Sequence, residues 1–229
     1  IASRPVAGVL FDLDNTLWDR DHAFRCWAMA FVEEELPHAA VEERAAAVDQ
    51  LVSLDAHGYG AKPAMFAAFK TAHRGVTGPV ARLVERFYTE MVCYAVVDPA
   101  VPSLLDTLQR SGIRFGIVTN GSRRQLHTVR ALGLDSLAAC VLVSGVFGCR
   151  KPEAAIFAAA ARRLRVAPGE ILFAGDNPIA DIWGAHRTGM RTAWIRRGQT
   201  WPPDLSAGCA DLIVDDIAAL VHLLRPSST

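Results

Sequence analysis

The sequence predicts an α/β fold, a doubly wound parallel sheet that is interrupted by an inserted helical bundle. Three observations support this prediction. Short, almost entirely apolar segments such as Val6–Phe11 and Ile113–Thr119 are typical of strands that are covered on both faces. From Asp98 onward such segments alternate with helical patterns, which is the order of parallel strands joined by right-handed crossovers. Between residues 18 and 95, helical patterns follow one another without a convincing strand.

We therefore expect two domains. Residues 1–17 and 96–229 are expected to form the α/β core, and residues 18–95 are expected to form a helical insert. A chain of 229 residues is long enough for a core with a smaller second domain. Because the first strand belongs to the same sheet as the later strands, the helical bundle interrupts the core and does not precede it.

The insert is expected to contain four successive helices. Phe24, Trp27 and Phe31 recur at the spacing of one helical face. Pro37 ends the first of these helices, and Gly75 ends the third. The expected helices cover residues 21–36, 40–55, 62–73 and 77–94.

The core is expected to alternate strands with helices, several of which end at a glycine. The expected strands cover residues 6–11, 113–119, 139–143, 171–174 and 191–195, with a further edge strand at residues 213–214. The expected helices cover residues 101–110, 122–132, 153–164, 179–188 and 217–224. This order predicts helices on both faces of one sheet.

Composition excludes several classes of protein. Lysine and arginine together number 24, as do aspartate and glutamate, so a nucleic-acid binder that works through a general basic surface is not expected. The five cysteines are scattered without a C-x-x-C pair, which argues against a disulfide framework or a zinc site and favours a reducing cytoplasm. We expect no membrane association, because no apolar run is long enough to span a bilayer and no signal-peptide core is recognisable.

Polar clusters follow the first four expected strands. Asp12 and Asp14 end the first strand, and because side chains alternate along extended backbone, both can point the same way. The other clusters are Thr119-Asn120-Gly121-Ser122, Arg150-Lys151-Pro152-Glu153, and Gly175-Asp176-Asn177 with Asp181 five residues beyond Asp176. Parallel strands deliver their carboxyl ends to one edge of a sheet, so these clusters are expected to form one active site.

The four clusters resemble, in order and spacing, the motifs of the haloacid dehalogenase (HAD) superfamily. The matching patterns are Asp-x-Asp-x-Thr, Thr-Asn-Gly, Lys-Pro-x-x-x-Ile-Phe and Gly-Asp-x-x-x-x-Asp. The resemblance covers the α/β part of the chain, and the helical insert lies where the type-1 cap of that superfamily lies. It implies a Rossmann-like core with a cap and an enzyme of the phosphatase branch.

The residue types suit phosphoryl transfer, which needs a nucleophile, an acid for the leaving oxygen and positive charge near the phosphoryl oxygens. Asp12 is the expected nucleophile, which would form an aspartyl-phosphate. Asp14 is expected to protonate the leaving alcohol and then to deprotonate the water that hydrolyses the intermediate. Lys151 would supply positive charge and restrain Asp12.

A magnesium site is expected beside these residues, because Mg²⁺ prefers hard oxygen ligands. Asp12 and Asp176 would supply carboxylates, and the resemblance adds the main-chain carbonyl of Asp14. Asp181 would support the metal directly or through water. The phosphoryl oxygens are expected to bind the Thr119 hydroxyl and the amides of Asn120 and Gly121, and Thr16 is a further candidate for this role.

Other reactions remain open on the same fold. A 2-haloacid dehalogenase also uses an aspartate nucleophile, but it needs no acid such as Asp14 for a halide leaving group. A phosphomutase would use the same acids, although nothing identifies a cap specific for sugar phosphates. Phosphonate hydrolysis would need a cap lysine, for which Lys62 and Lys70 lack a supporting motif. A non-catalytic binding protein would show damaged motifs, and none is damaged.

The substrate is expected to be a small phosphorylated metabolite that the insert selects, since a closing cap excludes water and contacts the leaving group. The motifs resemble the branch that contains nucleotide monophosphatases and acylneuraminate-9-phosphatases, which does not choose one substrate. Trp18, directly after the first motif, is expected either to cover the site or to pack under the insert. The oligomeric state is not predicted.

Overall fold

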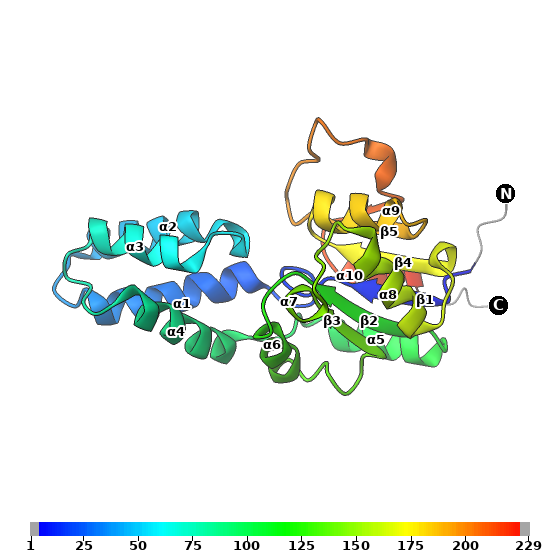
Figure 1. The fold of residues 1–229 in the computed structure, drawn as a ribbon, viewed down its shortest axis with the longest axis horizontal. Helices are drawn as coiled ribbons and strands as arrows, with labels where there is room; N and C mark the ends of the chain where they lie inside the picture. The colour runs from blue at the N-terminus through cyan, green and yellow to red at the C-terminus, as the bar shows by residue number, and fades with distance from the viewer. Residues whose placement is uncertain (1–4, 225–229) are drawn as a thin grey trace. The chain divides into compact units, whose positions relative to one another are not determined.

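The structure is a computed structural model that describes residues 5–224. It divides the chain into two compact units. One unit contains the described residues up to Trp18 and from Val97 onward, and the other unit is Asp19–Val96. Figure 1 shows strands and helices in the first unit and helices in the second.

The first unit is built on one sheet in which every pairing of neighbouring strands is parallel, in the order β3-β2-β1-β4-β5-β6. The strands are β1 (Gly8–Phe11), β2 (Arg114–Thr119), β3 (Cys140–Val143), β4 (Ile171–Gly175), β5 (Arg191–Ile195) and β6 (Leu212–Val214). The strand order reverses direction between β1 and β4. Ligands of open α/β sheets bind beyond the carboxyl ends of the strands at such a reversal.

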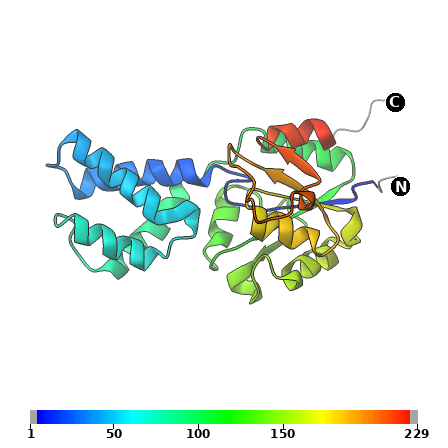
Figure 2. The ribbon, with the colours of Figure 1, turned by 90° about the horizontal axis from the view of Figure 1, so that it is seen from above.

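Helices lie on both faces of this sheet, as Figure 2 shows for α5 and α10 on one face and for α8 and α9 on the other. The helices of this unit are α5 (Val101–Arg110), α6 (Gln125–Ala131), α7 (Ser144–Phe147), α8 (Ala154–Leu164), α9 (Gly184–His186) and α10 (Ala218–Leu224). Short helical turns are η3 (Pro168–Glu170), η4 (Pro178–Trp183) and η5 (Ala207–Cys209).

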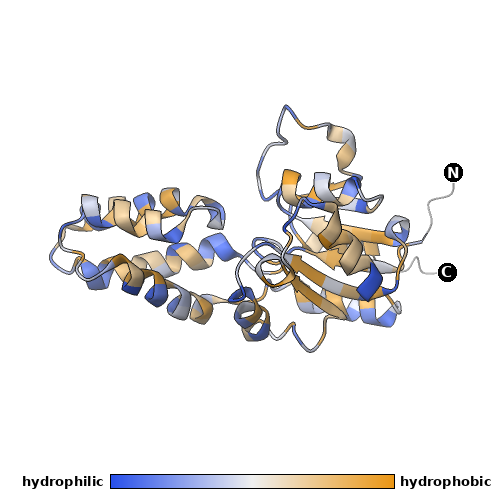
Figure 3. Ribbon diagram, in the orientation of Figure 1, coloured by the Kyte–Doolittle hydropathy of each residue, from blue (hydrophilic) through white to orange (hydrophobic). Residues whose placement is uncertain are grey.

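Apolar side chains fill the space between the sheet and its helices. Every residue of β1 and β4 is buried, as expected for central strands that are covered on both sides. Phe157 of α8 packs edge-on against Phe173 of β4, with ring centroids 5.2 Å apart. Figure 3 shows the strands in the hydrophobic colours. This packing gives the strand ends a rigid support.

The second unit is a bundle around six aromatic side chains, Phe24, Trp27, Phe31, Phe66, Phe69 and Phe87. Its helices are α1 (Arg20–Glu35), α2 (Val41–Asp55), α3 (Lys62–Ala72) and α4 (Val80–Met91), with the turns η1 (Ala56–Gly58) and η2 (Val92–Tyr94). Trp27 stacks on Phe31 at 4.9 Å and donates its indole N–H to Glu90 at 2.9 Å. The polar end of the largest buried ring is therefore satisfied.

The bundle also buries an ionic cluster around Asp55, which is 1% exposed. Arg20 donates to both carboxylate oxygens of Asp55, and Lys62 Nζ lies 2.8 Å from Oδ1. Lys62 also donates to the carbonyl oxygens of Gly60, at 2.7 Å, and of Gly58. Burial alone would raise the pKa of Asp55, but the two cations outweigh burial and lower it.

The predicted fold class is confirmed, including the edge strand β6. Several segments differ in detail from the prediction. The helix expected over residues 122–132 covers Gln125–Ala131, and the helix expected over residues 77–94 covers Val80–Met91 and is followed by η2. The helix expected from residue 179 begins instead at Pro178 with the π-helical turn η4, which the Asn177 side chain caps by accepting hydrogen bonds from the amides of Ile179 and Ala180. The unexpected α7 is a single turn that ends at Gly148, whose φ of 85° suits glycine.

Within residues 5–224, no helix has both the length and the apolar character that crossing a bilayer requires.

Candidate active site

Asp12 is placed by the register of the central strands. Phe11, the last residue of β1, lies opposite Ile117 of β2 and Ala174 of β4. The Asp12 amide then donates to the Ala174 carbonyl at 2.9 Å, so the chain stays beside β4 for one more residue. Asp12 is 7% exposed, which puts its carboxylate at the buried carboxyl end of the sheet.

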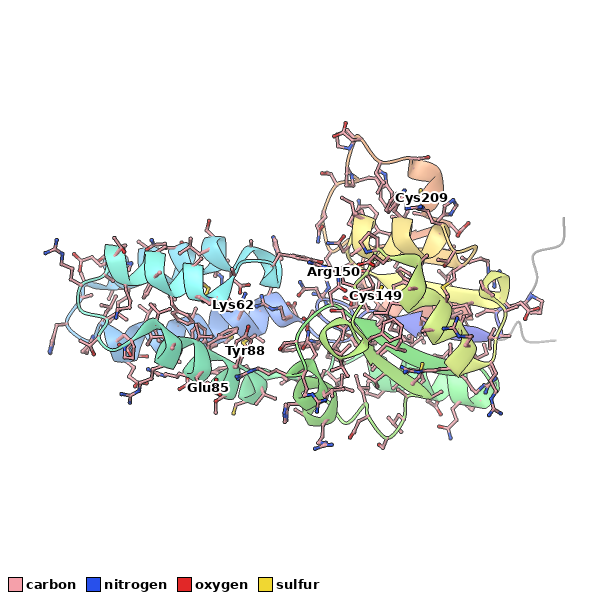
Figure 4. The ribbon with its side chains drawn as sticks, viewed as in Figure 1. Lys62, Glu85, Tyr88, Cys149, Arg150 and Cys209 are labelled. Carbon is pink, nitrogen blue, oxygen red and sulfur yellow. The ribbon has the colours of Figure 1, made fainter. Side chains whose placement is uncertain are left out.

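Lys151 joins two strand ends. Its Nζ lies 2.5 Å from Asp12 Oδ1 and 2.6 Å from Asp181 Oδ1, and the residue is 2% exposed. Burial alone would lower the pKa of Lys151, but the two carboxylates outweigh burial and raise it. Lys151 is therefore a permanent cation that restrains both carboxylates. Cys149 and Arg150, labelled in Figure 4, precede it in the loop after α7.

Asp181 lies in η4 and is 1% exposed. Its Oδ2 accepts a hydrogen bond from the Asn177 amide at 3.0 Å. A Cβ at Gly175 would lie 2.4 Å from this oxygen, so only glycine fits at the end of β4. The glycine of the fourth motif thus gives the Asp181 carboxylate the space that it needs.

Three carboxylates converge here in a way that suits a metal ion. Asp12, Asp176 and Asp181 each offer an oxygen, and these oxygens lie within 4.8 Å of one another. Lys151 is the cation that contacts two of them. Three carboxylates around one ammonium group leave an excess of negative charge, and hard oxygen donors favour a hard divalent cation. The residues present therefore fit a divalent metal.

The pKa values of Asp12 and Asp176 reflect the excess of negative charge among these carboxylates. Burial raises the pKa of Asp12 to about 7, although Lys151 opposes the effect, and the neighbouring Asp181 and Asp14 add to it. Burial also raises the pKa of Asp176 well above its usual range, with further contributions from Asp12 and Asp181. A bound divalent cation would offset this repulsion and favour the ionised carboxylates.

Asp14 is held differently from Asp12. The indole N–H of Trp18 donates to Asp14 Oδ1 at 2.9 Å, and the side-chain amide of Gln125 donates to Oδ2 at 2.6 Å. Trp18 is 3% exposed and Gln125 is the first residue of α6. Both donors are neutral. Neither contact with Asp14 was predicted. The Gln125 contact depends on where α6 lies relative to the loop after β1, whereas Trp18 lies only four residues after Asp14.

Asn120 has a side-chain contact that the sequence did not reveal. Its Nδ2 donates to the Lys151 carbonyl at 3.0 Å, and the Lys151 amide donates to Asn120 Oδ1 at 2.9 Å. This reciprocal pair fixes the backbone that carries the Lys151 ammonium group. The Gly121 amide, a predicted phosphate donor, donates to Ser144 Oγ at 3.0 Å in this structure.

The two predicted hydroxyl groups lie in different surroundings. Thr119 ends β2, is 1% exposed and has its Oγ1 3.4 Å from Gln125 Nε2. The hydroxyl of Thr16 is buried and has no hydrogen-bond partner among residues 5–224. A buried hydroxyl without a partner suits a ligand that is added later. The structure thus brings Asp12, Lys151, Asp176 and Asp181 together, whereas the Thr16 side chain forms no hydrogen bond with them.

The comparisons with known proteins agree with this arrangement. The chain matches the haloacid dehalogenase-like hydrolase family over residues 6–189, and it belongs to that family. It is 31% identical to the glyceraldehyde 3-phosphate phosphatase of Methanopyrus kandleri, over 96% of this chain and 97% of the relative. It is 32% identical to the phosphoserine phosphatase of Thermus thermophilus, over 86% of this chain and 78% of the relative.

A solved structure has the same fold. The putative HAD-hydrolase YfnB of Bacillus subtilis, whose crystal structure is bound to magnesium, has a TM-score of 0.75 at 21% identity. The match covers 96% of this chain and 99% of that chain. The predicted superfamily is therefore confirmed, and the protein is a HAD hydrolase.

Proposed function

We propose that this HAD hydrolase is a phosphatase that hydrolyses a small phosphate monoester with the help of Mg²⁺. One observation supports the proposal most directly. Asp12 and Asp181 share the Lys151 ammonium group at the end of the central strands, while Asp176 completes a set of carboxylates that suits a divalent cation. A nucleophile, a fixed cation and a metal-binding set at one sheet edge are the parts that phosphoryl transfer needs.

The reaction has two displacements at phosphorus. Asp12 attacks the phosphorus atom, and the bond from phosphorus to the leaving oxygen breaks while Asp14 gives its proton to that oxygen. Asp14 then takes a proton from water, whose oxygen attacks phosphorus and breaks the bond to Asp12. Inorganic phosphate leaves, and both carboxyl groups return to their starting states.

The remaining residues bind and orient. Lys151 keeps Asp12 in place and stabilises negative charge on the phosphoryl group. Asp12, Asp176 and the main-chain carbonyl of Asp14 would hold Mg²⁺, with Asp181 beside them. When bound, the ion neutralises negative charge around the phosphoryl oxygens. The Thr119 hydroxyl and the amides of Asn120 and Gly121 would contact the phosphoryl oxygens.

The substrate class follows from the relatives. The two relatives described above are named for glyceraldehyde 3-phosphate and phosphoserine, both compact three-carbon phosphates. We expect a small phosphorylated metabolite of this kind, with the helical unit selecting the leaving group. The aspartate at position 14 supports a leaving group that needs a proton, which sets the proposal apart from halide displacement.

A phosphate-release assay tests the proposal. The purified protein is incubated with 4-nitrophenyl phosphate, glyceraldehyde 3-phosphate and phosphoserine, with Mg²⁺ or with EDTA. We expect Mg²⁺-dependent release that Asp12→Asn lowers by on the order of 10³-fold or more. Failure to turn over any phosphate monoester would refute the phosphatase assignment, and full activity in Asp12→Asn would refute the nucleophile.

A further inference from the structure

The side chain of Gln125 reaches the proposed proton donor from a distant part of the chain. Gln125 is the first residue of α6 and is separated from Asp14 by 111 positions. Its Nε2 donates to Asp14 Oδ2 at 2.6 Å and lies 3.4 Å from Thr119 Oγ1. The Gln125 amide thus lies between the acid that follows β1 and the hydroxyl that ends β2.

Trp18 binds the other oxygen of the same carboxylate. Its Nε1 donates to Asp14 Oδ1 at 2.9 Å, and its buried ring is fixed by surrounding atoms. Each oxygen of Asp14 therefore receives an N–H group from a different direction. Two such hydrogen bonds define the plane and the rotation of a carboxylate, which one bond alone does not.

The chemistry of these donors differs from that around the nucleophile. Asp12 contacts an ammonium group, whereas Trp18 and Gln125, which each donate to one oxygen of Asp14, are neutral. An amide also carries an acceptor oxygen beside its donor nitrogen. Gln125 can therefore hydrogen-bond to Asp14 as a carboxylate and, after rotation, to Asp14 as a carboxylic acid. A residue that both gives and receives a proton needs this adaptability.

The space for Gln125 depends on the glycine of the second motif. A Cβ at Gly121 would lie 2.6 Å from Gln125 Cγ, closer than side-chain atoms approach one another. Alanine at position 121 would push the Gln125 side chain away from Asp14. The glycine thus permits the side chain of Gln125 to extend to the acid.

We propose that Gln125 is a positioning residue for proton transfer, and that it and Trp18 hold Asp14 in the orientation in which it protonates the leaving oxygen. The inference rests on the proposed phosphatase function. Because kcat/KM reports the first displacement, loss of Gln125 should lower kcat/KM for substrates with a basic leaving group. It should spare kcat/KM for substrates whose leaving group departs without a proton, although Asp14 also activates water in the second displacement of every substrate.

The test compares two substrates with the Mg²⁺-loaded protein. Ethyl phosphate releases a strongly basic alkoxide, whereas 4-nitrophenyl phosphate releases a stabilised phenolate. For Gln125→Met, which keeps the length and removes the amide, we expect kcat/KM for ethyl phosphate to fall by about 10- to 100-fold, part of the effect of general acid catalysis. We expect kcat/KM for 4-nitrophenyl phosphate to change by less than about threefold, because its first displacement needs no proton from Asp14.

Three further variants make the result specific. Gln109→Met changes an exposed glutamine of α5 in the same way and is expected to leave both substrates unaffected. Trp18→Phe keeps an aromatic ring and removes the indole N–H, so it should reproduce the selective loss. When Asp14→Asn is already present, adding Gln125→Met should lower kcat/KM for ethyl phosphate by less than about a further twofold, because the carboxyl group that Gln125 positions is already absent.

The outcomes separate this inference from the proposed function. Equal losses on both substrates, no loss on either, or full additivity with Asp14→Asn would overturn the positioning role while the enzyme remained a phosphatase. An inactive wild-type protein would overturn the phosphatase function and the inference together. Should Gln125→Met fail to fold by circular dichroism, Trp18→Phe decides the question by the same ratio of substrates.

Discussion

Within residues 5–224, two buried lysine–aspartate clusters differ in their charge balance. In the α/β unit, Lys151 is the cation between Asp12 and Asp181, with Asp176 nearby. In the helical unit, Asp55 is the anion between Arg20 and Lys62, and Arg20 also pairs with Asp21 at 3.4 Å. The same types of side chain thus form one cluster that is rich in carboxylates and one in which cations and carboxylates balance.

The direction of the pKa shift distinguishes the two clusters: the pKa of Asp55 is typical of a structural ion pair, whereas that of Asp12 is typical of a functional site. Asp55 has a lowered pKa, and Lys62 uses further hydrogen bonds to satisfy the carbonyls of Gly58 and Gly60. That cluster ties a loop to helices and is satisfied within its own unit. In the α/β unit the pKa of Asp12 is instead raised to about 7, because burial and neighbouring carboxylates disfavour its charge. Perturbed carboxylates of this kind mark functional sites.

The largest expected contrast comes from one substitution made in both clusters. Lys151→Met should lower kcat by about 10²- to 10³-fold, because it removes fixed positive charge from the phosphoryl-transfer site. Lys62→Met should keep kcat on 4-nitrophenyl phosphate within about tenfold, because Arg20 still pairs with Asp55. Steady-state kinetics measures both. Equal losses of activity would remove the distinction between a catalytic and a structural cluster.

The next effect concerns stability. Asp55→Asn leaves Arg20 and Lys62 buried without their carboxylate, and removing one partner from a buried ionic cluster typically costs about 3–5 kcal/mol. We expect a loss of this size in the free energy of unfolding, measured by urea denaturation and circular dichroism. Asp49→Asn, at an exposed pair with Arg25, is the control and should cost less than about 1 kcal/mol. Similar losses in both variants would contradict the structural role of Asp55.

The two clusters should also respond to pH in opposite directions. The pKa of Asp55 is lowered in the fold, so its stabilising effect is present above the unfolded value of 3.8 and is lost as pH falls below it. The pKa of Asp12 is raised from 3.8 to about 7, so its contribution is present below 3.8 and is lost as pH rises toward 7.

Calorimetry in EDTA from about pH 3 to about pH 8 measures the unfolding temperature at both the acid and the neutral end of this range. Asp55→Asn should reduce the loss of stability that occurs as pH falls below 3.8, and Asp12→Asn should reduce the loss of stability that occurs as pH rises toward 7. Added Mg²⁺ should raise the unfolding temperature of the wild-type protein more at neutral pH than at acid pH. If Mg²⁺ raised the unfolding temperature more at acid pH than at neutral pH, the carboxylates of the α/β unit would not repel one another.

The smallest effect is expected at Asn120, whose side chain holds the main chain of Lys151 in the carboxylate-rich cluster. Asn120→Leu removes both hydrogen bonds to the main chain of Lys151, so the ammonium group should lose its fixed position. We expect kcat to fall by about tenfold with little change in KM, since placement and not charge is lost. Steady-state kinetics on 4-nitrophenyl phosphate checks this, and an unchanged kcat would mean that Asp12 and Asp181 alone position Lys151.

Most strands and helices could be predicted from the sequence, because apolar runs and helical periodicity are properties of short segments. Apolar runs predicted β1 to β5, and the succession of helical patterns between residues 18 and 95 predicted the helices α1 to α4. The strand order could not be read so directly, since it depends on pairings between segments far apart in the chain. The short α7 was missed because a single turn has too few residues for a periodic pattern.

The candidate site divides in the same way. Asp12, Lys151, Asp176 and Asp181 stand in motifs, so the sequence named them, and the structure places them together. The catalytic roles that we assign to them stay predictions. Gln125 stands in no motif that we recognised, and its contact with Asp14 exists only because folding brings the first residue of α6 to the loop after β1.

The sequence by itself determined the class of the protein, because a hydrolase of this superfamily needs particular residue types at the ends of particular strands. The family match over residues 6–189 confirmed that class. Only the tertiary structure decided how the charges are distributed, with an excess of carboxylates at Lys151 and a balance of cations and carboxylates around Asp55. The reason is physical: a residue's type is local, whereas its burial and its partners come from segments that meet only when the chain folds.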